Sequence, residues 1–161
     1  PALDFKSVAK WFPIGEDALL DFFQKDRVLI PTNLSQDEYG HWVLMIVNMA
    51  ERRLEFYDPW AQRNPAQETT VLSVLQKLLL HFAGADEVRR GMVEDFALVP
   101  TPDCLPGQII SGDCGQFLLA QVDCLLNNRE FDYGQEDIPH HRRCTALSLM
   151  RGTVVRCTSP S

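Results

Sequence analysis

Two apolar segments joined by a short turn constrain the fold of this chain most strongly. Residues 41–48 are almost continuously apolar, and residues 53–58 return with large apolar side chains before Pro59. Proline cannot donate to a strand ladder, so the second segment ends there. Residues 49–52 then form the turn. The pattern predicts a β-hairpin around which the rest of the fold is built.

A turn centred on Met49 and Ala50 gives this hairpin a definite register. The predicted cross-strand pairs are Val47–Arg52, Met45–Leu54, Val43–Phe56 and His41–Asp58. The middle pairs place apolar side chains next to each other, and a slip of one residue would turn this set to the opposite face. At the open end, His41 and Asp58 would have Cβ atoms about 5 Å apart. This separation suits a carboxylate that orients an imidazole.

The remaining segments alternate between helix and strand. We predict helices over 15–25, 69–83, 114–127 and 135–150, strands over 27–31 and 94–100, and loops over 32–40, 60–67 and 101–112. This mixed order predicts an α+β fold, with a mixed sheet and a central hairpin flanked by helices. A chain of 161 residues is long enough for one domain with a full core, so we expect a single domain over residues 1–161.

Composition excludes several classes of function. The net charge of −7 is the wrong sign for a nucleic-acid-binding surface, and no apolar run reaches the roughly 18 residues of a membrane span. Five cysteines, at no spacing typical of a disulfide framework, predict free thiols and an intracellular, nuclear or cytoplasmic location. Pro1 is not an initiator methionine, so we expect a fragment or a processed form. The oligomeric state is not predicted.

The sequence Gly112-Asp113-Cys114-Gly115 carries the strongest chemical signal. It opens the helix predicted over 114–127, and a helix N-terminus stabilises a thiolate, as does a nearby imidazolium. Gln108, six residues earlier, offers a side-chain amide. Together with the backbone N–H of Cys114, this amide can stabilise a tetrahedral oxyanion. With His41 and Asp58, these residues predict a thiol-protease site.

Each feature also has a simpler interpretation when taken alone. A cysteine within a helix is more often a small core residue than a nucleophile. Aspartate followed by proline commonly only closes a strand. His140, His141 and Cys144 have helical spacing that suits part of a metal site, but further ligands are not apparent. We therefore expect no metal and no cofactor, and the protease hypothesis depends on the combination of residues.

That combination resembles the Ulp/SENP family of ubiquitin-like-protein cysteine proteases. The family has a strand that opens with His-Trp, a second strand that ends in aspartate, and a glutamine six residues before the cysteine of Asp-Cys-Gly. The corresponding residues here are His41-Trp42, Tyr57-Asp58, Gln108 and Asp113-Cys114-Gly115. Residues 28–33 resemble the stretch before the histidine, and Gln135 to Ile138 with Arg142-Arg143 resembles the family's last helix.

The resemblance implies a papain-like fold of the Ulp/SENP type and a role for each residue. His41 would act as general base and then acid, Asp58 would orient it, Cys114 would attack, and Gln108 would line the oxyanion hole. Trp42 would cover a narrow tunnel for a Gly-Gly tail, which only glycine can thread. The implied reaction is hydrolysis, through a thioester, of the bond after the tail of SUMO or another ubiquitin-like protein and its conjugates.

The sequence departs from the family pattern in two places, and two other functions are compatible with the same residues. Pro59-Trp60 stands where the family usually has a small residue, and only 40 residues precede His41, which suggests an N-terminally shortened domain. An acyltransferase of the same clan would use a similar site, although such enzymes generally carry glutamate as the acid. An inactive module that binds a ubiquitin-like protein is the second alternative.

Overall fold

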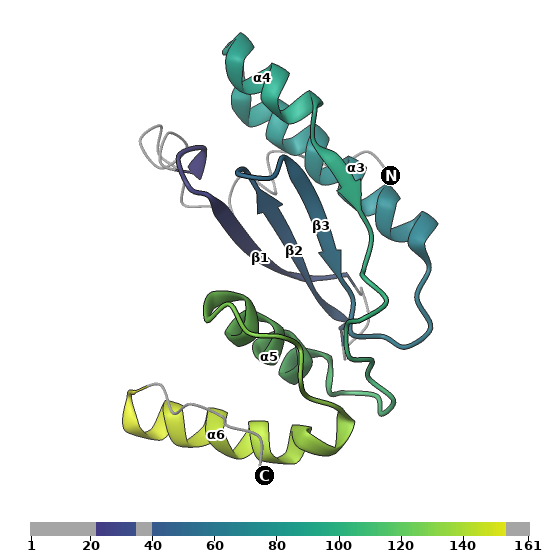
Figure 1. The fold of residues 1–161 in the computed structure, drawn as a ribbon, viewed down its shortest axis with the longest axis vertical. Helices are drawn as coiled ribbons and strands as arrows, with labels where there is room; N and C mark the ends of the chain where they lie inside the picture. The colour runs from purple at the N-terminus through teal and green to yellow at the C-terminus, as the bar shows by residue number, and fades with distance from the viewer. Residues whose placement is uncertain (1–21, 35–39, 154–161) are drawn as a thin grey trace. The chain divides into compact units, whose positions relative to one another are not determined.

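A computed structural model describes residues 22–34 and 40–153 of the chain (Figure 1). Most of the helix predicted over 15–25, the middle of the loop predicted over 32–40, and Cys157 lie outside the described residues. The described residues form two compact units. The first contains 22–30, 45–56 and 65–100, and the second contains 31–34, 40–44, 57–64 and 101–153. The single domain over residues 1–161 stays a prediction.

Four strands form one mixed sheet in the order β1-β2-β3-β4. The strands are β1 (Arg27–Asn33), β2 (Trp42–Asn48), β3 (Arg53–Tyr57) and β4 (Ala97–Val99). β4 runs parallel to β3, with Leu54 opposite Leu98. The turn between β2 and β3 occupies residues 49–52, and Arg52 adopts φ = 53° there. The predicted α+β fold with a hairpin at the centre of a mixed sheet is confirmed.

Two predicted strand boundaries are wrong. β1 continues through Pro31 to Asn33, into the predicted loop; proline is tolerated because β1 is an edge strand, where one side of the ladder is unpaired. The strand predicted over 94–100 is shorter, and Glu94 belongs to the preceding helix.

The argument for the hairpin register does not hold as stated. All residues of β2 from Val43 to Asn48 are buried, on both faces of the strand. A slip of one residue would therefore not expose the apolar set. The predicted register itself stays a prediction, apart from the contact between His41 and Asp58 described below.

Two helices belong to the first unit. α3 (Pro65–Ala83) starts four residues before the predicted helix, because Pro65 occupies the first helical position, where its missing N–H costs nothing. Its leucines 72, 75, 78 and 79 recur at helical spacing and are buried, and Gly84 follows with φ = 58°. α4 (Glu87–Glu94) was not predicted. It begins at Asp86, whose side chain accepts a hydrogen bond from the Arg89 N–H, and it packs against α3.

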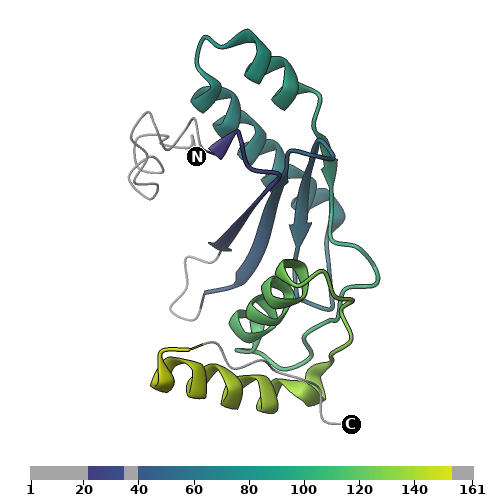
Figure 2. The same cartoon turned by 60° about the vertical axis from the view of Figure 1, so that its left-hand side comes forward.

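The second unit contains α5 (Cys114–Leu126), the short 3₁₀ turn η1 (Gln135–Asp137) and α6 (Ile138–Arg151). α5 begins at Cys114 as predicted, and α5 and α6 lie side by side in both ribbon views (Figure 2). The segment predicted as one helix over 135–150 starts as a 3₁₀ turn, and Pro139 stands near the start of α6. Gly152 ends α6 with φ = 63°.

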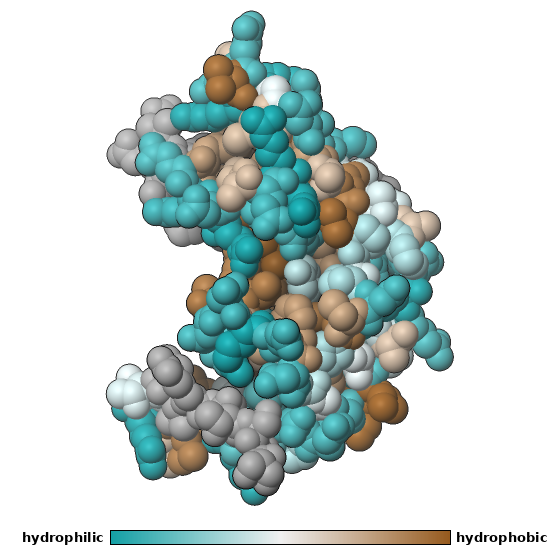
Figure 3. Space-filling model, viewed as in Figure 1, coloured by the Kyte–Doolittle hydropathy of each residue, from teal (hydrophilic) through white to brown (hydrophobic). Residues whose placement is uncertain are grey.

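A small core holds this second unit together. It consists of Phe117, Ala120, Cys124, Tyr133 and Ile138, with Phe131 packed against it. Val122 and Leu125, whose apolar side chains favour the inner face of α5, are only half-buried. On the face drawn in Figure 3, hydrophobic residues occur as separate patches among hydrophilic ones. In the described part of the chain, no helix is long and apolar enough to cross a membrane.

Candidate active site

All five residues singled out from the sequence lie in the second unit, so each contact below is internal to it. His41 directly precedes β2, and Asp58 directly follows β3. Their side chains meet, with His41 Nε2 2.8 Å from Asp58 Oδ1. The two side chains are 28% and 16% exposed, so solvent reaches the pair only partly. Because Nε2 faces the carboxylate, Nδ1 is the ring nitrogen that remains for a second partner.

Two hydrogen bonds hold Asp58 in place, one to its carboxylate and one from its backbone N–H. The N–H of Trp60 donates to Asp58 Oδ1 at 2.7 Å, and the N–H of Asp58 donates to Thr101 Oγ1 at 2.9 Å. Pro59 has no N–H, so Trp60 supplies the first amide after the aspartate and closes an Asx turn. The Trp60 ring also stands edge-on to the His41 ring, at 6.1 Å between centroids. The departure at Pro59-Trp60 thus supports the histidine–aspartate pair.

Gln108 is attached to this same turn. Its backbone N–H donates to the Pro59 carbonyl, and the residue forms an isolated parallel bridge with Trp60. The side chain is 3% exposed. The Arg63 guanidinium holds the loop that precedes Gln108 by donating to the carbonyls of Pro102 (2.8 Å) and Leu105 (2.5 Å). The predicted loop over 101–112 is therefore anchored at several points.

Cys114 is the first residue of α5 and is 6% exposed. Trp42 lies beside the next residue, Gly115, since a Cβ placed on Gly115 would be 3.8 Å from Cδ1 of the indole. The indole itself is 41% exposed. The start of α5 therefore borders the strand end that carries His41 and Trp42.

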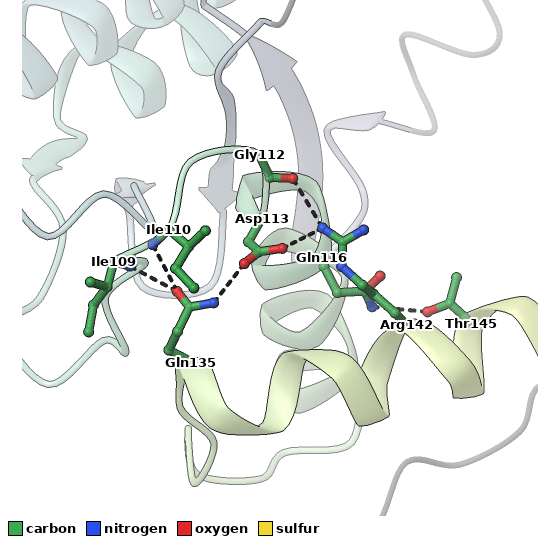
Figure 4. Close-up of polar contacts among 8 residues, drawn as sticks. All are labelled: Ile109, Ile110, Gly112, Asp113, Gln116, Gln135, Arg142 and Thr145. Atoms are coloured by element: carbon green, nitrogen blue, oxygen red, sulfur yellow. Dashed lines mark hydrogen bonds and ion pairs between the residues drawn. The ribbon is translucent and has the colours of Figure 1, made fainter.

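Asp113, immediately before Cys114, does not cap α5 with its side chain. An aspartate at this position usually accepts a hydrogen bond from the first amides of the helix. Here its carboxylate binds Gln135 Nε2 at 2.6 Å and pairs with Arg142 (Figure 4). Arg142 also donates to the Gly112 carbonyl at 3.3 Å. Both partners of Asp113 come from the segment that forms η1 and α6.

The structure therefore joins His41 and Asp58 directly, places Trp42 beside Gly115, and attaches Gln108 to the turn that follows Asp58. Four supporting residues were not predicted to take part: Arg63, Thr101, Gln135 and Arg142. Their contacts connect segments about 20 to 40 residues apart through single side chains, and such contacts leave no periodic pattern in a sequence.

Two residues of α6 singled out by their spacing, His140 and Cys144, lie close together. Cys144 Sγ lies 3.5 Å from His140 Nε2, but within residues 22–34 and 40–153 no three His, Cys, Asp or Glu side chains are grouped to hold an ion. The four described cysteines are free thiols, as predicted; Cys104 is exposed, and Cys114, Cys124 and Cys144 are buried.

Several known proteins are similar to this chain. A profile of the Ulp1 protease family, C-terminal catalytic domain, matches residues 4–151. Sentrin-specific protease 5 of Mus musculus is 30% identical over 124 residues, which cover 77% of this chain and 15% of that protein. Ubiquitin-like-specific protease ESD4 of Arabidopsis thaliana is 26% identical over 151 residues, covering 92% of this chain and 28% of that protein. The chain thus spans less than a third of either relative.

Solved structures agree on the fold. The C-terminal Ulp1 protease domain in complex with Smt3, the yeast ortholog of SUMO, matches with a TM-score of 0.67 at 22% identity. The match covers 91% of this chain and 61% of that chain. A Ulp1 structure with its catalytic cysteine oxidised to a sulfinic acid matches with a TM-score of 0.68 at 21% identity, covering 94% and 63%.

Proposed function

This chain belongs to the Ulp1 protease family, and we propose that it is a cysteine protease that hydrolyses the peptide or isopeptide bond after the Gly-Gly tail of SUMO or a related ubiquitin-like protein. One observation carries the proposal. The 2.8 Å contact between His41 and Asp58 lies at the strand end whose next residue, Trp42, borders the start of α5, where Cys114 stands. The structure of Ulp1 bound to Smt3 supports the substrate class.

The first half of the proposed reaction forms a thioester. The Cys114 sulfur attacks the carbonyl carbon of the terminal glycine, and its proton passes to His41 Nδ1, because Nε2 is engaged by Asp58. The negative charge moves to the carbonyl oxygen, where the Gln108 amide and the Cys114 N–H donate hydrogen bonds. When the carbon–nitrogen bond breaks, the leaving amine takes the proton from His41.

The second half releases the modifier. His41 removes a proton from water, the hydroxide attacks the thioester carbon, and the Cys114 sulfur leaves and regains its proton. Asp58 orients the imidazole during both steps and stabilises its charged form. Trp42 covers the tail of the substrate; the half-exposed indole beside Gly115 supports this role. No cofactor enters these steps.

A panel of C-terminal electrophile probes tests the proposal. SUMO, ubiquitin and another ubiquitin-like protein, each carrying a vinyl-sulfone-type group in place of the last carboxylate, are incubated with the chain. We expect covalent capture of the SUMO probe at Cys114, mapped by peptide mass spectrometry. Binding without capture would support an inactive module, and turnover of acetyl-coenzyme A without modifier cleavage would support an acyltransferase.

Cys114→Ala provides the matched control. The substitution removes only the sulfur, so the chain should fold normally but neither capture the probe nor cleave a SUMO precursor. Retained cleavage in this variant would contradict the assignment of the nucleophile.

A further inference from the structure

The side-chain amide of Gln135 binds both ends of the loop 109–113 (Figure 4). Its Oε1 accepts hydrogen bonds from the backbone N–H groups of Ile109 at 2.9 Å and Ile110 at 3.2 Å. Its Nε2 donates to Asp113 Oδ2 at 2.6 Å. One planar group from η1 therefore fixes the distance between the two ends of the loop.

The two ends are the residues next to the proposed chemistry. Ile109 follows Gln108 directly, and Asp113 precedes Cys114 directly. We propose that Gln135 is a positioning residue, which sets the Gln108 amide and the Cys114 sulfur at the separation that the oxyanion requires. This inference rests on the proposed function and adds a residue that acts on the reaction without touching the substrate.

Packing contributes little to the shape of this loop. The side chains of Ile109 and Ile110 are 76% and 60% exposed, so they contribute little packing. Gly112 adopts φ = 91°, and nothing lies within 4 Å of the position of a Cβ there, so its backbone is not held by close packing. The two amide ends of the Gln135 side chain therefore supply much of the constraint on this loop.

Arg142 complements Gln135 at one end of the loop. It pairs with Asp113 Oδ1 and donates to the Gly112 carbonyl, so its contacts concern the end next to Cys114. The Asp113 side chain is 11% exposed and that of Arg142 is 55% exposed, so the guanidinium neutralises a mostly buried carboxylate from the solvent side. Gln135, by contrast, contacts both ends of the loop, and so connects the residue after Gln108 with the residue before Cys114.

Two reactions of Cys114 separate positioning from general damage. Hydrolysis passes through an oxyanion, whose donors must lie about 2.7–3.1 Å from the oxygen, and a misplacement of about 1 Å costs on the order of 10²-fold in rate. Alkylation by iodoacetamide forms a sulfur–carbon bond and expels iodide, with no oxyanion at any point. A change that acts through Gln108 should slow hydrolysis and spare alkylation.

The test compares Gln135→Met with the unaltered chain. Methionine has a similar length and lacks both hydrogen-bonding ends of the amide. We expect kcat for a fluorogenic SUMO C-terminal amide to fall on the order of 10²-fold, with KM little changed. Alkylation of Cys114, followed by peptide mass spectrometry, should stay within about threefold, because that step needs no oxyanion donor. Glu136→Met, an exposed neighbour in the same turn, is the control and should retain kcat.

A double-mutant cycle with Gln108→Ala completes the test. If Gln135 acts through Gln108, the double variant should hydrolyse about as slowly as Gln108→Ala alone. Multiplied losses, or alkylation that falls in step with kcat, would overturn the inference. An unaltered kcat in Gln135→Met would overturn the inference but leave the proposed function standing. An unaltered chain that neither hydrolyses the substrate nor captures the SUMO probe would overturn the proposed function, and the inference with it.

Discussion

At the scale of single residues, the histidine–aspartate pair is held from several directions. Asp58 receives the Trp60 N–H on the same oxygen that faces His41, and its own N–H reaches Thr101. A carboxylate fixed in this way can hold the imidazole in one orientation without help from solvent. The identities of His41 and Asp58 were predictable from the hairpin. Thr101 was not, because it lies 43 residues after Asp58 and contacts only its backbone.

Asp58→Asn should preserve the fold and remove most of the activity. Asparagine keeps the size of the side chain, but its amide cannot stabilise a charged imidazole and favours the wrong tautomer of His41. We expect kcat to fall on the order of 10³-fold or more, with KM little changed. Steady-state hydrolysis of a SUMO C-terminal amide measures this, and an activity close to that of the unaltered chain would remove Asp58 from the proposed mechanism.

Thr101→Val should have a smaller effect through Asp58. Valine fills the same space but leaves the Asp58 N–H without its acceptor, at a cost of about 1–3 kcal/mol in the free energy of unfolding. A loosened Asp58 should lower kcat by about tenfold, a cost of about 1.4 kcal/mol in transition-state stabilisation. Urea unfolding and kinetics on Thr101→Val and Thr101→Ser check both effects. Serine retains the hydroxyl and should recover most of the loss.

At the scale of elements, two helices show what sequence patterns can and cannot predict. α5 was found because glycines and Cys114 mark its start, but its apolar pattern gives only part of its buried face. Gln121 is fully buried, and a polar residue is normally assigned to the outside of a helix. α4 was missed; it has only eight residues, of which Val93 alone is buried. Its signal is the cap at Asp86.

His141 in α6 should make stability depend on pH. Burial, the largest cause, lowers its pKa below the ordinary value; Asp137 and Asp123 oppose this, and His140 and Arg129 add to it. The folded state thus takes up the proton less readily than the unfolded state. The contribution of neutral His141 is therefore complete above the unfolded pKa of about 6.5, and it is lost as pH falls from there through the lowered folded pKa.

His141→Phe should weaken this dependence, since phenylalanine cannot titrate and keeps a ring next to Tyr133, whose centroid lies 5.6 Å from that of His141. Urea midpoints at pH 7 and pH 5 measure the effect. We expect the unaltered chain to lose more stability between the two values than the variant. Equal losses would show that His141 does not titrate differently on folding.

At the scale of the whole molecule, the sequence predicted the hairpin, the mixed sheet and the residues of the candidate site. These features follow from local signals: apolar runs, a proline that ends a strand, and glycines around Cys114. The site is supported by side chains such as those of Arg63 and Gln135, which form hydrogen bonds to segments distant in the sequence. Most of their partners are backbone groups, which carry no residue-specific signal; the exception is the Asp113 carboxylate bound by Gln135.

Cooperative unfolding tests the single domain predicted over residues 1–161. Strands β1 and β2 run from one compact unit into the other, because each unit contains part of both. We expect thermal unfolding followed by far-UV circular dichroism and by tryptophan fluorescence to give coincident transitions. Both described tryptophans, Trp42 and Trp60, lie in the second unit, whereas α3 and α4 lie in the first. Two separated transitions would contradict one domain.

The partners of Asp113 have a consequence for how this protein is made. Gln135 and Arg142 lie 21 and 28 residues after Cys114 in the chain. A ribosome therefore synthesises the cysteine before the groups that fasten the loop in front of it. On the growing polypeptide that loop is unsecured, and it acquires its fastening only when α6 emerges from the exit tunnel.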